Sequence, residues 1–546
     1  MSFFIFIITF SIKSQSELVI PCDGRVQLSQ DSILFSWNEC PTCINYHLEY
    51  STEPNFTSSI SITVFNSDTS IVLSEGNYFW RVKALNALND PIWISNIREL
   101  TLIDLESIGD LEFWFDPNYG LTIDSDSLVA DWESYSNHEF NISQAANEKK
   151  PIKQSNIIND KSGIYFDGDN LDNLGDQLNG PISGANISIK TVLSLFKYYN
   201  TNFFMHSGKF NTSGSGQRYI IALNGSSETF VTGQAAFTSF RVNMNQTNTA
   251  ERNKWLLISS VNNAATLENY CLSPKIGGVR RLHGIIMENI GFSNVLTPSN
   301  YELVEKYLRY KYAAPVSLGK DLYVPYGFCD TTLQTNSEFE SYLWSTGENT
   351  RQISISDNGI YWVECTDIFG FVSRDTIQVS YPDYNIPNNT LFCPDGVVEW
   401  NAMEGSGYNF IWSDGSTGQV NSIGTVGNYF VNIIDSNGCE LTTDSFLFSE
   451  DPFPSTVMLG SDTSLCSGNE ILFLSGFNES ESYIWSTGAT SQNISIIESG
   501  FYSIEAINSN SCVGFDTIEV SIIGTAPSLS YSIENQICQG SPLNFD

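Results

Sequence analysis

Four carboxylates, Asp167, Asp169, Asp172 and Asp176, lie close together in the sequence and could bind a metal ion. Carboxylate oxygens at short spacing suit Ca²⁺. Against a metal site, the fifth loop position is Leu171, so the EF-hand spacing is not met, and Asp-Gly pairs are ordinary turn formers. We therefore expect a structural turn, with calcium bound by Asp167, Asp169 and Asp172 as the alternative.

Residue patterns for catalysis are missing from the sequence. Glycoside hydrolases need two carboxylates flanking the scissile bond, commonly from a Glu-x-Asp-x-x-Glu strand, and no Glu here is followed by Asp two positions later. The four histidines, His47, His138, His206 and His283, are too scattered for a zinc site. Gly-x-Ser-x-Gly, Walker and dinucleotide-binding patterns are also absent. We expect a binding protein and no enzyme activity.

Three aromatic residues of the segment 105–316 are candidates for ligand binding. Tyr119, Trp132 and Tyr135 could present rings on which a sugar stacks. Trp132 alternates with Ala130 along an expected strand, which favours a place in the core. The ligand itself cannot be read from these residues.

Composition limits the elements that position these side chains. A chain of 546 residues exceeds what one hydrophobic core organises, so several domains are expected. The apolar fraction of 41% and the aromatic fraction of 13% are those of folded domains. The formal net charge of −36 repels nucleic acid and anionic lipid. Neither is an expected partner.

The C-terminal part repeats one pattern of short alternating strands. Copies of Trp-Ser-x-Gly are followed by Gly-x-Tyr, and each Trp precedes its Gly by 15 positions and its Tyr by 17. The apolar period is two, which predicts β-sandwich domains. The matched positions are Trp344, Gly359 and Tyr361, then Trp412, Gly427 and Tyr429, then Trp485, Gly500 and Tyr502.

Cysteine spacing follows the same repeat. Cys393 and Cys439 are 46 positions apart, as are Cys466 and Cys512, so we predict one disulfide inside each of these two repeats. The first repeat has Phe371 where the second cysteine would fall. Cys329 could pair with Cys365, or both could be free and buried. Cys40 and Cys43 are expected in a local or Cys22-linked disulfide, and the pairing of Cys22 and Cys271 stays open.

The N-terminal end of the sequence carries a signal of export, and the C-terminal end carries the start of a further repeat. Residues 1–16 hold an apolar run too short to span a bilayer, followed by small residues, which predicts a secretory signal peptide. No later stretch reaches transmembrane length. Around Cys538 the sequence echoes the start of the third repeat, so we expect a fourth repeat that the sequence does not complete.

Three family resemblances organise the chain. The repeats resemble the immunoglobulin-like or PKD-like repeats of secreted surface proteins of Bacteroidota, many of which are exported by type IX secretion through a C-terminal sorting domain. The strand with Tyr78, Trp80 and Val82, together with Trp37, is similar to a fibronectin type III domain. The segment 105–316 resembles concanavalin A-like, LamG-type jelly rolls on four features: Trp114-x-Asp116 with Val129 and Trp132; Phe166-Asp167-Gly168; Ile285, Glu288 and Asn294; and a closing helix after Thr297.

The expected fold class is all-β and multidomain, with Ig- and fibronectin-like sandwiches and a jelly roll that ends in one helix. The expected parts are a signal peptide (1–16), a fibronectin III-like domain (17–104), a jelly roll (105–316), three Ig-like repeats (317–382, 383–452 and 453–523) and the start of a fourth (524–546).

What the resemblances imply is an extracellular or cell-surface adhesion or carbohydrate-binding protein. The jelly roll would recognise a glycan or surface protein, often with calcium, and the repeats would form a disulfide-stabilised stalk. The alternatives are a polysaccharide-degrading hydrolase whose site is unrecognised or missing, and a purely structural filament component.

Overall fold

The computed structural model describes residues 18–525, apart from 30, 41, 137, 139, 169–174, 181–185, 188, 202, 210–218, 231–238, 248, 262–266, 269, 275–279, 453–458, 468–470 and 475–481. The signal-peptide and fourth-repeat predictions therefore lie outside the described residues. The chain forms two compact units. Unit 1 comprises residues up to Tyr323 and Asp330–Ser380, and unit 2 comprises Val324–Cys329 and the residues from Tyr381 onward.

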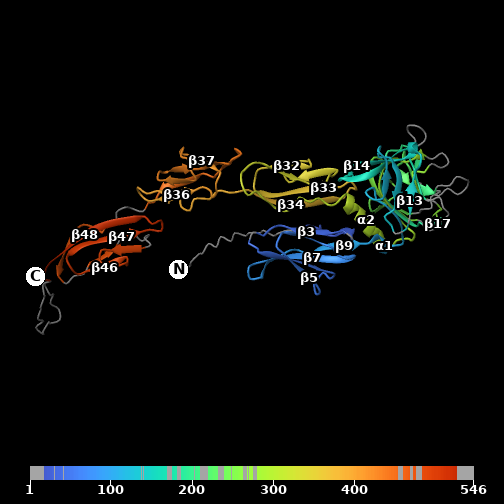
Figure 1. Cartoon of the computed structure of the whole chain (residues 1–546). Coiled ribbons are helices and arrows are strands. Elements are labelled where there is room, and N and C mark those ends of the chain that lie inside the picture. The colour runs from blue at the N-terminus through green and yellow to red at the C-terminus, as the bar shows by residue number, and fades with distance from the viewer. Residues whose placement is uncertain are drawn as a thin grey trace, which may run out of the picture. The chain divides into compact units, whose positions relative to one another are not determined.

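The structure confirms the predicted fold class, a multidomain all-β protein (Figure 1). In the described residues, α-helix is limited to the single turn α1 (Leu105–Ile108) and to α2 (Pro298–Tyr312). Thr297 caps α2 by accepting a hydrogen bond from the Asn300 backbone N–H, and Pro298 occupies its first turn.

Unit 1 begins with a sandwich of two sheets. One has the order β1-β3-β6, and the other has the order β2-β9-β7-β4-β5 with β8 beside β7. Trp37 and Trp80 are fully buried between them, because alternate residues of β3 and β7 face the same core. The strands are β1 (Leu18–Ile20), β2 (Arg25–Leu28), β3 (Ile33–Trp37), β4 (Asn45–Ser51), β5 (Ile60–Val64), β6 (Asp68–Ile71), β7 (Gly76–Leu85), β8 (Pro91–Ile94) and β9 (Arg98–Ile103).

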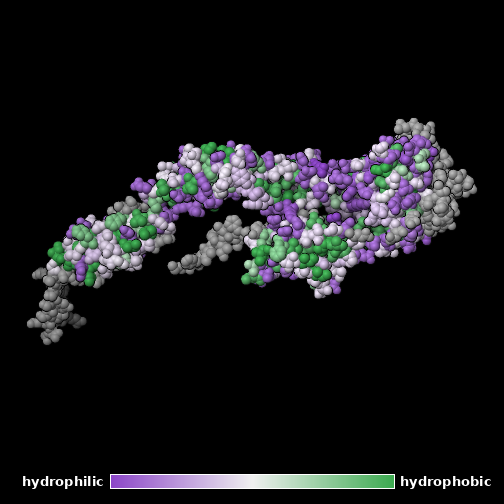
Figure 2. Space-filling view, in the orientation of Figure 1, coloured by the Kyte–Doolittle hydropathy of each residue, from purple (hydrophilic) through white to green (hydrophobic). Residues whose placement is uncertain are grey.

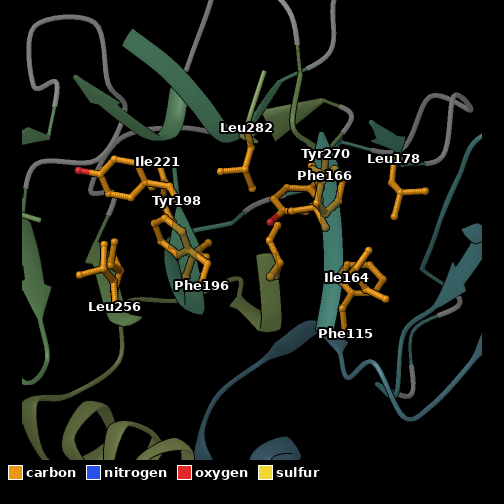
Figure 3. Close-up of a cluster of buried hydrophobic side chains, with 14 of the residues drawn as sticks. Phe115, Ile164, Phe166, Leu178, Phe196, Tyr198, Ile221, Leu256, Tyr270 and Leu282 are labelled. Atoms are coloured by element: carbon orange, nitrogen blue, oxygen red, sulfur yellow. The ribbon is translucent and has the colours of Figure 1, made fainter. Parts of the chain in front are cut away.

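A larger sandwich follows, with sheet orders β14-β15-β28-β18-β24-β22-β23 and β11-β12-β13-β16-β26-β19-β20-β21. In addition, β10 pairs with β28, β27 pairs with β19, and β17 pairs with β25. Figure 3 shows part of the apolar core between the two sheets, including Phe115, Phe166, Phe196 and Tyr270.

The strands of this sandwich are β10 (Leu111–Phe115), β11 (Leu121–Ile123), β12 (Val129–Glu133), β13 (Asn141–Ser143), β14 (Ile152–Ile158), β15 (Lys161–Asp167), β16 (Leu178–Asn179), β17 (Asn186–Ile187), β18 (Thr191–Tyr198), β19 (Phe203–Lys209), β20 (Tyr219–Asn224), β21 (Thr229–Phe230), β22 (Ser239–Val242), β23 (Asn245–Gln246), β24 (Trp255–Val261), β25 (Leu267–Glu268), β26 (Tyr270–Leu272), β27 (Arg280–Arg281) and β28 (His283–Phe292). A 3₁₀ turn covers Asn147–Lys149.

A second apolar cluster covers the outer face of this sandwich. Val304 and Leu308 of α2 pack there against Trp114 of β10, and Val26 of β2 and Phe369 of the first repeat belong to the same cluster. Both faces of the strands β10 and β28 are therefore buried, which explains why their sequences read as nearly continuous apolar runs. One continuous core joins three successive parts of unit 1.

In the described residues, the first and third repeats each have two small sheets, and the second repeat has three. The first has the orders β29-β34-β33-β31 and β30-β32, and the third has β43-β48-β47-β45 and β44-β46. The second has β35-β42-β39, β36-β38 and β37-β40-β41.

The strands of the repeats are β29 (Leu322–Tyr323), β30 (Thr331–Gln334), β31 (Ser341–Trp344), β32 (Gln352–Ile355), β33 (Gly359–Thr366), β34 (Val372–Ser380), β35 (Leu391–Phe392), β36 (Val398–Asn401), β37 (Asn409–Trp412), β38 (Val420–Ile423), β39 (Gly427–Tyr429), β40 (Val431–Ile434), β41 (Glu440–Thr442), β42 (Phe446–Glu450), β43 (Thr463–Ser467), β44 (Ile471–Leu474), β45 (Ser482–Trp485), β46 (Asn493–Ile496), β47 (Gly500–Ile507) and β48 (Val513–Thr525).

The repeated residues make the same contacts in each copy. The buried Trp344, Trp412 and Trp485 each donate an indole N–H to the carbonyl six residues later, at 2.8, 2.8 and 2.9 Å. The hydroxyls of the repeated tyrosines donate to the carbonyl four residues earlier, forming tyrosine corners. The Gly of Trp-Ser-x-Gly has φ of +97°, +85° and +85°, a conformation that favours glycine.

The disulfides correct the predicted pairing. Cys40 and Cys43 are bonded to each other, but Cys439 is bonded to Cys329 and Cys512 to Cys393. The predicted pairs Cys393 with Cys439 and Cys466 with Cys512 are wrong. Their equal separation of 46 positions misled the prediction, because the bonded pairs are 110 and 119 positions apart and join each second cysteine to an earlier part of the chain.

The alternative of Cys329 with Cys365 is wrong too, since Cys365 is a buried free thiol. Cys22 and Cys271 are also free. The side chain of Cys466 lies outside the described part of the chain.

Candidate functional site

A cleft of about 450 Å³ in unit 1 is the best candidate for a ligand site. This volume lies in the range of small-molecule sites. One wall comes from β2 and Asp31, and the other comes from β10, the loops that flank β11 and β12, the start of β15, and α2. The lining residues are Arg25, Val26, Gln27, Leu28, Asp31, Trp114, Asp116, Asn118, Tyr119, Tyr135, Lys161, Tyr307, Tyr310 and Lys311.

A tight turn after β10 positions Tyr119. The side chain of Asp116 accepts a hydrogen bond from the Asn118 backbone N–H at 2.8 Å, and its carbonyl accepts one from Tyr119 N–H. Gly120 then adopts φ +64°, and a Cβ there would meet the Glu133 carbonyl oxygen at 2.7 Å. The sequence Asp-Pro-Asn-Tyr-Gly therefore folds as a turn that presents Tyr119 beside the cleft.

Aromatic rings form a continuous row along the cleft. Tyr119 and Tyr135 make an edge contact with centroids 4.3 Å apart, and each side chain remains 41% exposed. Tyr135 contacts Trp114 at 4.7 Å, and Trp114 contacts Tyr307 of α2 at 6.3 Å. The exposed rings of Tyr119 and Tyr135 therefore pack on the buried rings of Trp114 and Tyr307, which fix their positions.

Beneath the row lies a buried charge cluster. Lys311 Nζ is 2.6 Å from a carboxylate oxygen of Asp116 and 2.6 Å from one of Glu288. Glu288 is fully buried and also accepts hydrogen bonds from Trp114 Nε1 at 2.6 Å and from the Tyr312 hydroxyl at 2.7 Å. Glu288 thus fixes the orientation of the Trp114 ring.

Charge and burial shift the pKa values of this cluster. Burial alone would raise the pKa of Asp116, but the adjacent Lys311 ammonium lowers it below its ordinary value. Burial raises the pKa of Glu288 against the lowering effect of Lys311. For Lys311, burial would lower the pKa, but the carboxylate of Glu288 raises it well above its ordinary value.

The structure separates the three predicted aromatic candidates. Tyr119 and Tyr135 line the cleft together. Trp132 does not, because its ring is fully buried against Phe115 and its N–H donates to the Asp116 carbonyl oxygen. The prediction that Trp132 binds a ligand is wrong, because side chains along β12 alternate between the two faces of the sheet and Trp132 faces the core.

The acidic cluster is described only in part. Asp167 and Asp176 exchange hydrogen bonds, each carboxylate accepting from the other's backbone N–H, at 3.2 and 2.9 Å. These bonds join the end of β15 to Asp176. Asp169 and Asp172 lie outside the described residues, so the calcium alternative stays a prediction.

In the described ranges, one group of possible metal ligands lies close together: the side chains of Cys329, Asp435 and Cys439 have ligand atoms within 4.8 Å of one another. Both of these cysteines are in a disulfide and so offer no thiolate to a metal.

Most of the residues that line the cleft were not predicted from the sequence. Arg25, Asp31, Lys161, Tyr310 and Lys311 come from segments far apart in the chain, and no local pattern marks any of them. One signal in the sequence could have indicated part of the cleft. In α2 the charged Lys311 follows the apolar residues Tyr307 and Leu308, and a lysine close to a buried face requires a partner of opposite charge.

The surface of the first sandwich carries exposed apolar side chains (Figure 2). Phe65, Val72 and Leu88 are 76%, 67% and 81% exposed. Nothing in the structure indicates what covers them.

No known protein family and no curated protein matches the chain. Solved structures match it weakly. A Bacteroides ovatus mixed-linkage glucan utilization locus protein, SGBP-B, in complex with a mixed-linkage heptasaccharide is 13% identical with a TM-score of 0.12. That match covers 36% of this chain and 64% of the other.

Fibronectin(III)-like modules of Clostridium thermocellum CbhA are 10% identical with a TM-score of 0.17, covering 27% of this chain and 95% of theirs. A 1.5-MDa bacterial ice-binding adhesin is 10% identical with a TM-score of 0.15, covering 36% of this chain and 91% of its own. Matches this weak leave the ligand and the activity open. In the described residues, no helix has the length and apolarity to cross a membrane.

Proposed function

We propose that this protein is an extracellular adhesion protein that binds a carbohydrate in the cleft of unit 1. The observation that carries the proposal is the exposed pair Tyr119 and Tyr135 on a cleft of about 450 Å³. Aromatic faces bind the apolar faces of sugar rings, and exposed, rigid tyrosines lose little conformational entropy on binding.

The polar lining suits a ligand rich in hydroxyl groups. Arg25, Lys161 and Asn118 can donate hydrogen bonds, and Asp31 and Asp116 can accept them. A sugar hydroxyl both donates and accepts, so a mixed lining of this kind can satisfy it. A few convergent polar groups in a partly aromatic cleft are the usual composition of a binding site.

The rest of the chain fits a display role. In this proposal, the signal peptide directs export, a secretion machinery brings the chain to the cell surface, and the disulfide-linked repeats carry the cleft away from that surface. A surface glycoprotein could supply the same glycan as a free polysaccharide would.

Catalysis is the second candidate function, and the charge cluster favours it to a limited degree. Two neighbouring carboxyl groups whose pKa values are shifted in opposite directions can act as an acid and a base. Here the pKa of Glu288 is raised by burial, and the pKa of Asp116 is lowered by Lys311. Glu288, however, is fully buried and does not line the cleft. We therefore favour binding, and reducing-sugar release that is lost in Glu288→Gln would reverse this preference.

The test is a glycan array followed by titration calorimetry with the full chain. Tyr119→Ala and Tyr135→Ala should each weaken binding about five- to thirtyfold, since truncated aromatic anchors cost about 1–2 kcal/mol. Tyr323→Ala is the matched control, because Tyr323 is 70% exposed and lies outside the cleft lining. Equal effects of all three variants, or no binding to any glycan, would refute the proposal.

A chelator arm tests calcium separately. If Asp167, Asp169 and Asp172 hold Ca²⁺, chelation should lower the melting temperature, and Asp169→Ala should abolish that difference. An unchanged melting temperature in chelator would remove calcium from the proposal and leave the cleft untouched.

A further inference from the structure

The three repeats share a turn that reaches toward the part of the chain in front of them. An Asp or Asn begins each turn, and its Oδ1 accepts hydrogen bonds from the backbone N–H groups two and four residues later. These residues are Asp367, Asp435 and Asn508. The fourth residue after each is Phe371, Cys439 and Cys512, respectively.

In the second repeat the turn holds the segment Val324–Cys329. The other carboxylate oxygen of Asp435 accepts a hydrogen bond from the Phe328 backbone N–H at 2.8 Å. Cys439 completes the attachment through its disulfide to Cys329, with Cα atoms 5.1 Å apart. The turn therefore binds the segment that lies between β29 and β30 of the first repeat.

In the third repeat the same turn holds the second repeat. Asn508 Nδ2 donates to both carboxylate oxygens of Asp451 at 3.1 Å, and Asn510 Nδ2 donates to the same carboxylate at 2.6 Å. Cys512 is bonded to Cys393, which follows β35 of the second repeat, with Cα atoms 5.3 Å apart. The attachment again joins each turn to the repeat before it.

The first repeat uses the turn without a disulfide. Asp367 pairs with Arg309 of α2 at 3.1 Å, and the Arg309 guanidinium lies 3.9 Å above the Phe371 ring. The helix in front of this repeat offers no cysteine, and the turn has Phe371 in place of one. This explains why the first repeat contains Cys329 but lacks the second cysteine of the pattern.

We infer that these disulfides form a staggered ladder that limits how far the repeats can be stretched. The order along the chain is Cys329, Cys393, Cys439, Cys512, and the bonds join the first to the third and the second to the fourth. Three stretches of chain therefore connect the two disulfides in parallel: 329–393, 393–439 and 439–512. The shortest stretch, 46 positions from Cys393 to Cys439, bears the load first.

The ladder has a large mechanical effect. An unfolded chain extends by about 3.5 Å per residue, so the ladder holds the distance from Cys329 to Cys512 to about 160 Å. With both disulfides reduced, the 183 positions between these cysteines could extend to about 640 Å. Disulfides inside each repeat would instead leave 91 positions free, or about 320 Å. The connectivity therefore suits a stalk under tension.

Peptide mapping of the full chain under non-reducing conditions tests the connectivity. Cleavage after glutamate places Cys329, Cys439 and Cys512 on separate peptides, 306–338, 405–440 and 506–519, and Cys393 on 365–399. We expect 306–338 linked to 405–440, and 365–399 linked to 506–519. A link between 365–399 and 405–440, or no linked peptides, would overturn the proposal.

Force spectroscopy of the full chain tests the consequence. Reduction should add about 480 Å to the contour length, because the ladder hides 137 of the 183 positions. In Cys393→Ser, where the bond from Cys329 to Cys439 alone remains, reduction should add about 390 Å. In-repeat disulfides would give about 320 Å for the wild type and about 160 Å for the variant, and these values would refute the ladder.

Discussion

Replacing Lys311 by methionine should destabilise unit 1 and disturb the cleft. Lys311 is the cation that compensates both Asp116 and Glu288, at 2.6 Å from each. Methionine matches much of the lysine stem but carries no charge. The variant therefore leaves the fully buried Glu288 carboxylate with hydrogen bonds from Trp114 and Tyr312 alone.

The expected cost follows from burial. Removing one partner of a buried ion pair costs about 3–5 kcal/mol. The Lys311 and Asp116 side chains are 16% and 15% exposed, so solvent screens part of their charge. The cost should therefore lie at the low end of this range. We expect about 3 kcal/mol, which corresponds to a fall of about 6–12 °C in the melting temperature for a domain of this size.

The cost should depend on pH in a stated direction. Burial raises the folded-state pKa of Glu288 above its unfolded value of about 4.3. The penalty of the uncompensated carboxylate is then absent below about pH 4 and grows as pH rises through the folded-state pKa. The variant should therefore lose more stability relative to wild type at pH 8 than at pH 4.

Calorimetry of the full chain measures the cost, and hydrogen exchange in peptides of β28 and α2 locates it. Lys306→Met is the matched control on the same helix, since Lys306 pairs with Glu302 at an exposed site and should change stability by about 0.5 kcal/mol or less. The double variant with Glu288→Gln should recover part of the loss. A loss below about 1 kcal/mol for Lys311→Met would refute a supporting role of the cluster.

Three further predictions concern the cores and the disulfides. Burial lowers the pKa of His206 to about 3, so stability should fall by about 2 kcal/mol between pH 6.5 and pH 5, as the unfolded state gains a proton that the folded state does not, and His206→Gln should flatten this part of a calorimetric pH series. Trp412→Ala should cost the second repeat about 3–5 kcal/mol in denaturant titrations, whereas Phe501→Ala, at a side chain 70% exposed, should cost the third repeat about 0.5 kcal/mol or less; similar costs would contradict the core assignment. Cys512→Ser opens a loop of 119 positions and should cost about 2–5 kcal/mol, detected as faster proteolysis of the third repeat, and an unchanged rate would count against the disulfide to Cys393.

Local pattern was enough to predict the strands of the repeats. Trp344, Trp412 and Trp485 are core residues with matching hydrogen bonds, because alternation and turn glycines act over a few residues. The N-cap and first turn of α2 could be predicted from Thr297 and Pro298, because capping also depends on neighbouring residues only. Tyr119 and Tyr135 were named as candidates by residue type alone, without the turn that places them.

Two features were decided only by the tertiary structure. The cleft brings Arg25 and Lys161 beside Lys311 through the cluster that packs β2 on α2, and no local pattern encodes such a contact. The disulfide register depends on which repeat lies against which turn, and the equal in-repeat separation of 46 positions gave no sign of this. Short-range periodicity thus determined the elements from sequence, whereas partners separated by more than 100 residues were chosen by packing.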